Sequence, residues 1–490
     1  MSQDLNRTTA DAPAAPIRLV HLGLGAFHRA HQVWYTQHAK DGAKWGYASF
    51  TGRGPKLAEA LAPQDGLYTL VTRADDGDST ELITALSEAQ PADNLARLVE
   101  LMADPDVAVV TLTVTEAGYH LTDSGTLDMN DADVVADVKV LRAAHAGASG
   151  ADGASADAPG VPDALDTAAG RIVAGLAARR AGEADADSDR SDSDGSGSAG
   201  GIAVMSCDNV AGNGEMTRAA VLGTARAVDP ELAEWIERTV TFPSTSIDRI
   251  TPATTDELIE EVAAETGYVD NAPVVAEPFA SWVISGDFPA GRPAWETAGA
   301  EFVDDIEQFE SRKLWLLNGS HSLMAYYGQL RGHETVADAI ADDDIRTRVE
   351  ALWDEAAHHL TADGLDVPAY REALLERFTN PRIRHNLAQI GIDGGTKQRM
   401  RAVPIMKAER RAGRDGKAAA FSIAAWIAFL LRNGGSEDIA DSRADVLNRA
   451  RQSSAPVAAL VSALDEGLGT DRSAVELIRE LTDSILAACE

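Results

Sequence analysis

The sequence predicts an α/β protein: an N-terminal domain of alternating strands and helices, followed by a mainly α-helical domain. Three patterns lead to this prediction. Residues 17–22 form a short apolar run that ends in a glycine-rich turn and a helix-compatible stretch. Residues 107–114 are rich in β-branched side chains, as a buried parallel strand requires. From about Asp305 onward, apolar residues recur with the 3.6-residue period of amphipathic helices, which places the domain boundary near residue 300.

Length, charge and cysteine content narrow the class of protein. The 490 residues suffice for two or three domains, and 45% hydrophobic with 24% charged residues is typical of a soluble protein. A formal charge of −34 argues against binding to nucleic acids or to anionic membranes. With only Cys207 and Cys489, the chain has no disulfide framework and no cysteine zinc cluster, which fits the cytoplasm.

Two segments bear on targeting. Residues 1–16 are polar and lack the basic and apolar regions of a signal peptide, so we expect a disordered tail. The longest apolar run, residues 418–431, is too short to cross a bilayer and suits a buried helix.

The glycine turn is the first candidate site. Residues 23–31 read Gly-Leu-Gly-Ala-Phe-His-Arg-Ala-His. Gly23 permits a tight turn, and Gly25 lets the backbone approach a pyrophosphate. The usual third glycine is absent, because His28 occupies its place. From this motif alone, a dinucleotide site and a structural turn without ligand are equally favoured.

The second strand, residues 46–51, ends where an acidic residue usually holds the adenosine ribose. No acid is present there. Arg53 and Lys56 follow instead, and basic groups suit a 2′-phosphate, although solvated loop charges are an equal alternative. The preference between NAD and NADP therefore stays open.

Further polar residues follow later strands. Residues 68–72 and 80–85 alternate apolar with polar side chains and predict a hairpin. Glu116 and Asn209 each come just after a predicted strand, where the carboxyl ends of a parallel sheet place ligands. For Glu116 a plain loop carboxylate is the alternative, and Asp248 lies in an irregular, proline-bounded segment.

Two low-complexity stretches interrupt the N-terminal domain, which we place at residues 17–299. Residues 144–159 and 180–201 are rich in Ala, Gly, Ser and Asp and flank a predicted helix at 163–179. Because neither stretch offers enough apolar surface to offset its ordering entropy, we expect disordered acidic insertions. The helical domain then covers residues 300–490.

A polar triplet opens this helical domain. At about 100° per residue, Lys313, Asn318 and His321 fall within one arc of a helix surface. Lys313 and His321 are nevertheless separated by roughly 12 Å along a regular helix axis, so either the lysine extends or the first turn is irregular. Taken alone, a buried histidine, a capping asparagine and a solvated lysine form the more economical interpretation.

Six segments in the same order resemble the polyol-specific long-chain dehydrogenases, the family of mannitol 2-dehydrogenase and fructuronate reductase. That family has a histidine at the third glycine position. The resemblance implies a Rossmann-like domain, a helical domain, a nicotinamide and a sugar held in a cleft, and no metal. The segments that carry it are residues 23–31, 113–119, 206–209, 248–252, 277–279 and 313–321.

The resemblance also implies roles. Lys313 is the catalytic acid/base, Asn209 and Asn318 bind the carbinol oxygen, and His321 positions it. Glu310 is a candidate proton relay. The residues expected at the cofactor are Gly23, Gly25, Ala26, Phe27, Arg53, Glu116 and Asp248.

The resemblance further implies a small polyol or ketose as the substrate. Arg384 and Lys397 lie in a segment with more cations than a neutral polyol needs, so they suit a carboxylate or phosphate. Binding of sugar hydroxyls, or neutralisation of nearby acidic residues, is the simpler alternative. Mannitol/fructose oxidoreduction with NAD or NADP is the first choice. Fructuronate reduction and mannitol 1-phosphate oxidation are alternatives. A non-catalytic nucleotide-sensing module is a further one, which the presence of Lys313 and its two partners disfavours.

Overall fold

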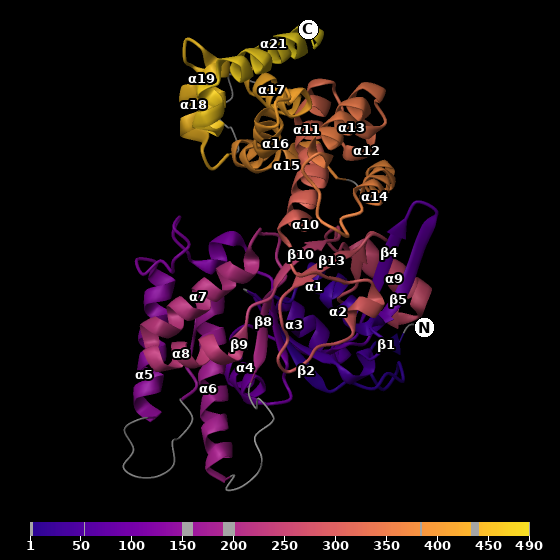
Figure 1. The fold of residues 1–490 in the computed structure, drawn as a ribbon. Coiled ribbons are helices and arrows are strands. Elements are labelled where there is room, and N and C mark those ends of the chain that lie inside the picture. The colour runs from indigo at the N-terminus through magenta and orange to yellow at the C-terminus, as the bar shows by residue number, and fades with distance from the viewer. Residues whose placement is uncertain are drawn as a thin grey trace. The chain divides into compact units, whose positions relative to one another are not determined.

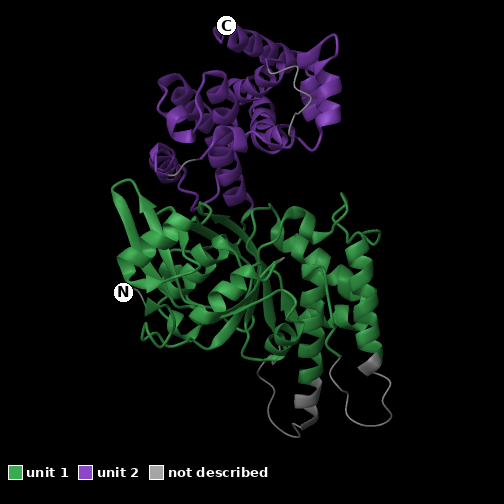
Figure 2. Ribbon diagram, turned by 180° about the vertical axis from the view of Figure 1, so that it is seen from behind, with its two compact units in different colours: residues 1–306 green, residues 307–490 purple. Residues whose placement is uncertain are grey.

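The computed structural model describes residues 3–52, 54–148, 160–189, 201–382, 385–432 and 441–489. The chain divides into two compact units, residues 1–306 and 307–490, coloured separately in Figure 2. The division falls a few residues beyond the boundary expected near residue 300.

A six-stranded parallel sheet forms the centre of the first unit. Its order runs outward on both sides from β2 and β7, so that the direction of winding reverses between these two strands. This is the order of the Rossmann fold, which confirms the predicted α/β class. In spatial order the strands are β6 (Leu86–Gln90), β3 (Gly46–Phe50), β2 (Ile17–Leu22), β7 (Val109–Leu112), β8 (Ile202–Ser206) and β9 (Val240–Thr241).

Helices cover both faces of the sheet (Figure 1). Consecutive residues of β2 point to opposite sides: Leu19 packs in one buried cluster and Val20 in the other. The Val20 cluster contains α4 (Leu95–Ala103), α6 (Ala168–Asp189), α7 (Asn213–Val228) and α8 (Pro230–Thr239). The Leu19 cluster contains α1 (Ala26–Ala30), α2 (Gln32–His38) and α3 (Lys56–Leu61).

Smaller sheets flank the main one. The predicted hairpin is present as β4 (Tyr68–Ala74) and β5 (Gly77–Ile83), which pair antiparallel. β12 (Val274–Ala276) extends it in parallel. A separate sheet joins β10 (Ser244–Asp248), β13 (Ser281–Ser285) and β14 (Glu301–Phe302).

The expectation of a disordered N-terminal tail was wrong for residues 3–16. β1 (Gln3–Asp4) pairs in parallel with β11 (Tyr268–Val269), and Leu5 is fully buried. Arg7 donates to the carbonyl oxygens of Thr84 and Leu86 at 2.9 and 2.8 Å. These partners lie far away in sequence, so the local composition did not reveal them.

The expected insertions were drawn too wide. Residues 144–148 belong to α5 (Ala132–Ala148), and residues 180–189 belong to α6. Their alanine content supports helix, and Arg180 pairs with Asp229 and Glu231 across neighbouring elements. Residues 149–159 and 190–200 lie outside the described part of the chain.

The second unit is helical throughout its described part. The irregular helix that opens it consists of α10 (Glu307–Arg312), a π-helical stretch (Lys313–Asn318), α11 (Gly319–Leu323) and a second π-helical stretch (Met324–Gly328). Around it lie α13 (Asp343–Ala357), α14 (Val367–Thr379), α16 (Gly394–Arg411) and α17 (Lys417–Arg432), with α21 (Arg472–Ala488) packed on α17. Helix α17 contains the whole apolar run at 418–431 and is buried, as expected. Among the described helices, none has the length and apolarity needed to span a bilayer.

Candidate functional site

The turn after β2 requires glycine at one of its two glycine positions. Gly23 has φ +116°, and a Cβ there would lie 2.4 Å from Thr113 Oγ1 and 2.5 Å from the Thr113 carbonyl oxygen. Gly25 is extended, and the nearest atom to its Cβ would be 3.5 Å away. Ala26 and Phe27 open helix α1 directly after it. The fold therefore requires glycine at position 23. At position 25 the fold does not require glycine, which leaves ligand binding as a possible reason for the residue.

Two buried histidines pack beside this turn and support it. The rings of His21 and His28 stack at 3.4 Å with an angle of 2° between their planes. His21 Nδ1 pairs with Thr111 Oγ1 at 2.8 Å, and His28 Nε2 pairs with Ser49 Oγ at 2.9 Å. Burial lowers the pKa of His21 to about 3 and that of His28 well below its usual value, so both are neutral. His28 thus joins α1 to the sheet. The glycine motif, in which His28 replaces the third glycine, gave no indication of this role.

The strand ends align along one edge of the sheet. Leu22 pairs in register with Leu112, and Leu112 pairs with Ser206. Gly23, Glu116 and Asn209 follow these three strands, so the structure brings the three predicted regions to the same edge. Glu116 and Asn209 are exposed, and Asp248 ends β10.

A buried hydroxyl cluster joins two loops at this edge. Ser206 Oγ donates to Asp208 Oδ2 at 2.6 Å, and Tyr119 donates to the same oxygen. Asp208 Oδ1 is buried and accepts no hydrogen bond. Burial raises the pKa of Asp208, although hydrogen bonds from Ser206, Tyr119 and neighbouring donors act against the shift. The cluster ties the segment that follows Glu116 to the residue before Asn209, and sequence patterns gave no sign of it.

Two predicted residues, Arg53 and Arg384, lie outside the described residues. Lys56, the other cation after β3, begins α3.

In the second unit, Lys313 begins a π-helical stretch that extends to Asn318. The Gly319 N–H bonds to the carbonyl of Leu314, five residues earlier, as π-helical geometry requires. The turn is thus irregular, one of the two solutions that the spacing of Lys313 and His321 predicts. Lys313 and Asn318 are partly buried, and His321 is buried.

Two neighbouring helices hold this stretch in the same manner. From α13, Trp353 Nε1 donates to the Leu316 carbonyl at 3.0 Å and to Ser320 Oγ at 2.7 Å. From α16, Arg401 Nη1 donates to the Asn318 carbonyl at 3.0 Å and to Ser322 Oγ at 2.8 Å. Each donor therefore bridges a carbonyl and the hydroxyl four residues later.

Cations surround His321. Burial lowers its pKa well below the usual value, and the neighbouring His385 imidazole and the cations Arg377, Arg401 and Lys397 lower it further. Its ring meets His385 edge-on at 4.9 Å between centroids. Lys397 lies one turn before Arg401 on α16 and donates to the Ile390 carbonyl at 2.9 Å. His321 is accordingly neutral in an electropositive environment.

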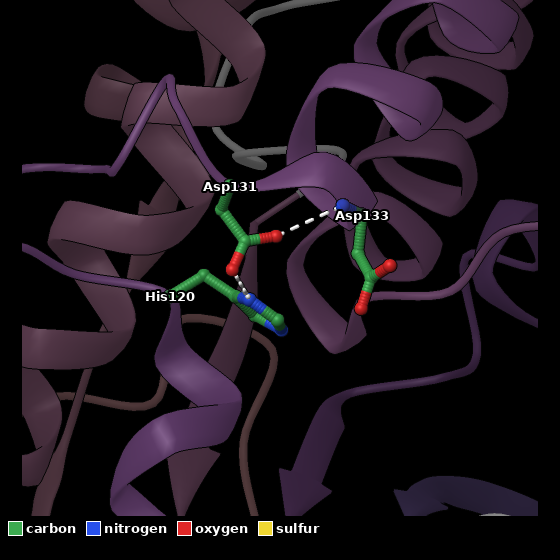
Figure 3. A group of neighbouring side chains, drawn as sticks. All are labelled: His120, Asp131 and Asp133. Atoms are coloured by element: carbon green, nitrogen blue, oxygen red, sulfur yellow. Dashed lines mark hydrogen bonds and ion pairs between the residues drawn. The ribbon is translucent and has the colours of Figure 1, made fainter.

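One group of described side chains has the composition of a cation site, namely His120, Asp131 and Asp133 (Figure 3). Asp131 already accepts on both oxygens: Oδ1 from the Asp133 N–H at 2.9 Å and Oδ2 from His120 at 2.9 Å. The side-chain hydrogen bond from His120 lowers the pKa of Asp131. These contacts explain the group as the start of helix α5.

Comparison with known proteins adds to this geometry. The family model for the mannitol dehydrogenase Rossmann domain matches residues 17–297, and that for the mannitol dehydrogenase C-terminal domain matches residues 305–486. D-mannonate oxidoreductase of Escherichia coli (strain K12) is 37% identical over 84% of this chain and 79% of its own. Polyol:NADP oxidoreductase of Gluconobacter oxydans (strain 621H) is 35% identical over 84% of this chain and 80% of its own. Among solved structures, the ternary complex of Pseudomonas fluorescens mannitol 2-dehydrogenase with NAD and D-mannitol is 30% identical, with a TM-score of 0.74, and covers 99% of this chain and 96% of its own.

Proposed function

The chain belongs to the mannitol dehydrogenase family, and on that premise we propose that it interconverts a sugar alcohol and a ketose by hydride transfer with NAD or NADP. Mannitol and fructose are the proposed pair. The observation that carries the proposal is the helix that begins at Lys313, where an amine, an amide and a neutral imidazole lie on a stretch whose backbone is clamped by Trp353 and Arg401. The cysteines of the described chain are free, which supports a cytoplasmic location.

Lys313 is the proposed acid/base. Oxidation of a secondary alcohol needs a base for the hydroxyl proton while hydride leaves for C4 of the nicotinamide. An amine accepts that proton only in its neutral form, which burial and neighbouring positive charge favour. Lys397 and Arg401, close enough to act on His321, supply such charge in this unit. Glu310, one turn before Lys313, is the proposed relay of that proton to solvent.

The remaining groups stabilise charge on oxygen. Asn209 and Asn318 are proposed as amide donors to the developing alkoxide, each contributing about 3 kcal/mol to the barrier reduction. His321 is proposed to orient the same oxygen. Because its imidazole is neutral, it can donate one hydrogen bond without adding a further positive charge.

The cofactor is proposed to bind in the first unit. The bound nicotinamide dinucleotide supplies the hydride acceptor or donor. Gly23 and Gly25 would bring the backbone to the pyrophosphate, with Ala26 and Phe27 beside it. Glu116 and Asp248, together with Arg53, complete the proposed contacts.

Absorbance at 340 nm tests the proposal directly. The purified protein is assayed with NAD or NADP against the alcohols mannitol, arabinitol, mannonate and mannitol 1-phosphate, and with NADH or NADPH against the ketones fructose and fructuronate. We expect reversible turnover of mannitol and fructose. Cofactor binding without turnover of any substrate would contradict the proposal and favour the nucleotide-sensing alternative.

A second candidate is the reduction of a uronate such as fructuronate. Lys397 and Arg401 form no ion pair with a carboxylate among the described residues, yet both lie near His321. Cations that lack acidic partners suit a substrate carboxylate, and the similarity to a D-mannonate oxidoreductase supports this alternative. Lys397, with Arg384, is the proposed carboxylate ligand.

The variant Lys397→Met separates these candidates. If Lys397 binds a carboxylate, KM for fructuronate should rise at least tenfold while KM for fructose changes little. An equal change for both substrates would remove Lys397 from carboxylate binding.

A further inference from the structure

Arg401 is a partly buried cation whose charge has no obvious structural use. Burial lowers its pKa to about 10, and the nearby Tyr326 hydroxyl is the group that opposes this shift. Its Nε is buried without a hydrogen-bond partner, and no carboxylate pairs with it among the described residues. Desolvating an arginine without a counter-charge is costly, so the cost calls for a function.

Trp353 shows that the helix can be clamped without charge. It makes the same bridge, from a carbonyl to a hydroxyl four residues on, with a neutral indole N–H. A neutral donor would therefore be sufficient for packing at Asn318 and Ser322. The guanidinium adds a positive charge at the junction where the π-helical stretch passes into α11.

The position of this clamp is specific. Asn318 is the last residue of the π-helical stretch, and His321 lies between the two residues that Arg401 bridges. A π-helical stretch is rare and is maintained by its surroundings. The side chains it carries keep their directions only while the backbone is held.

We propose that Arg401 is a positioning residue for the reaction: it fixes the backbone that carries Asn318 and His321 and keeps their surroundings positively charged. The inference rests on the proposed function. It adds a residue that acts through Asn318 and His321 rather than by touching the substrate.

Three substitutions separate donor from charge. Arg401→Lys keeps the charge and one donor, Arg401→Gln keeps a donor without charge, and Arg401→Met keeps neither. We expect kcat to fall about 100-fold in the methionine variant, because a displacement near 1 Å at the reacting groups has that effect. The lysine variant should recover most of this loss, and glutamine should be intermediate. KM and NADH affinity should change less than threefold.

Arg443→Met is the matched control. Arg443 Nη1 also donates to a helix carbonyl, that of Ala463, at 2.9 Å in the same unit. A purely structural role for Arg401 predicts that both methionine variants lower the melting temperature and leave kcat near wild type. That result would overturn the inference, as would equal losses of kcat in the two variants.

Hydrogen exchange supplies a readout that needs no activity. In Arg401→Met, amides of residues 313–323 should exchange at least tenfold faster, while those of β2 and β7 keep their wild-type rates. Unchanged exchange rates at residues 313–323 would contradict the claim that Arg401 holds this backbone in place. A wild-type protein that turns over no substrate would instead contradict the proposed function, and exchange would still test the clamp.

Discussion

The two units differ in the groups that they contribute to the proposed site. In the first unit, the proposed cofactor contacts include main-chain atoms of a glycine turn, which the stacked neutral rings of His21 and His28 support. In the second unit, side chains are offered from an irregular helix, and the groups behind them are cations. The buried histidines show the contrast, since burial alone dominates at His21, whereas the cations Arg377, Arg401 and Lys397 add to burial at His321.

This difference determines how each unit is damaged. A site built from backbone fails when an atom is added, because a Cβ at Gly23 collides with Thr113 and a Cβ at Gly25 would occupy space proposed for the ligand. A site built from side chains fails when a functional group is removed, even though the fold survives. The predictions below use that distinction, beginning with the largest effect.

Removal of the proposed base should have the largest effect. Lys313→Ala is expected to lower kcat by 10²- to 10⁴-fold, the usual contribution of a positioned acid/base. NADH affinity should stay within twofold, because the glycine turn belongs to the other unit. Steady-state kinetics and fluorescence titration measure the two quantities. A variant that retains near-normal kcat would remove Lys313 from the chemistry.

The glycine turn should respond to added atoms. Gly23→Ala is expected to cost about 1–3 kcal/mol of stability, through positive φ and the collision with Thr113. Gly25→Ala should leave stability unchanged, because its Cβ meets no protein atom closer than 3.5 Å. The variant should nevertheless bind NADH at least tenfold more weakly, because the added Cβ would keep the backbone away from the pyrophosphate.

Gly182→Ala is the control for these two variants, since nothing lies within 4 Å of its Cβ position in helix α6. Chemical denaturation and NADH titration separate stability from binding. Equal behaviour of the Gly23 and Gly25 variants would contradict the division of roles.

Local patterns in the sequence predicted most of the first unit. Apolar runs located β2 and β7, and the alternation of apolar and polar residues at 68–72 and 80–85 located the β4–β5 hairpin. In the second unit, the spacing of Lys313 and His321 left an extended lysine or an irregular turn, and the turn is irregular. These features depend on residues close together in the chain, so period and turn composition suffice.

What the sequence did not reveal depends on distant partners. β1 pairs with a strand more than 250 residues away, His28 bonds to Ser49, and Arg401 reaches back to Asn318. Such contacts exist only after the chain has folded, and no local pattern distinguishes Arg401 from a solvated helix arginine. Only the family resemblance assigned roles to Lys313 and Asn209, and those roles remain predictions.

Buried carboxyl groups extend the comparison to stability. Glu409 in the second unit is buried and fully paired: Arg414 donates to both of its oxygens, and His358 and His359 contact Oε1 at 3.1 and 2.7 Å. These hydrogen bonds, chiefly from Arg414, lower its pKa to about 2 from a usual value of 4.5. The stabilisation is therefore complete above pH 4.5 and is lost as the pH falls towards 2.

Glu409→Gln should lower the unfolding free energy by about 1–2 kcal/mol at pH 7. It should also reduce the loss of stability that the wild-type protein shows as the pH falls from 4.5 towards 2. Urea unfolding at several pH values between 7 and 2.5, followed by helical content, tests it. If the variant lost stability at low pH to the same extent as the wild type, Glu409 would not be the cause of that loss.

The smallest effect is expected at Asp208, the unpaired counterpart of Glu409. Its carboxyl is buried, Oδ1 has no partner, and no cation pairs with it among the described residues. Burial raises the folded-state pKa above the usual 3.8, so the folded state holds its proton to higher pH than the unfolded state. Stability should accordingly decline as the pH rises above 4.

Asp208→Asn removes this penalty while its side-chain oxygen still accepts from Ser206 and Tyr119. We expect no change in unfolding free energy at pH 4 and a gain of up to about 1 kcal/mol at pH 7, measured by urea denaturation. Asp137→Asn is the contrasting control, because Asp137 is buried but its oxygens accept from the Asp166 and Thr167 N–H groups, so its substitution should destabilise. Destabilisation by both substitutions at pH 7 would mean that Asp208 is stabilised by its surroundings after all. A gain at Asp208 together with lost activity would instead indicate that the first unit, too, keeps an unfavourable buried charge beside its proposed site.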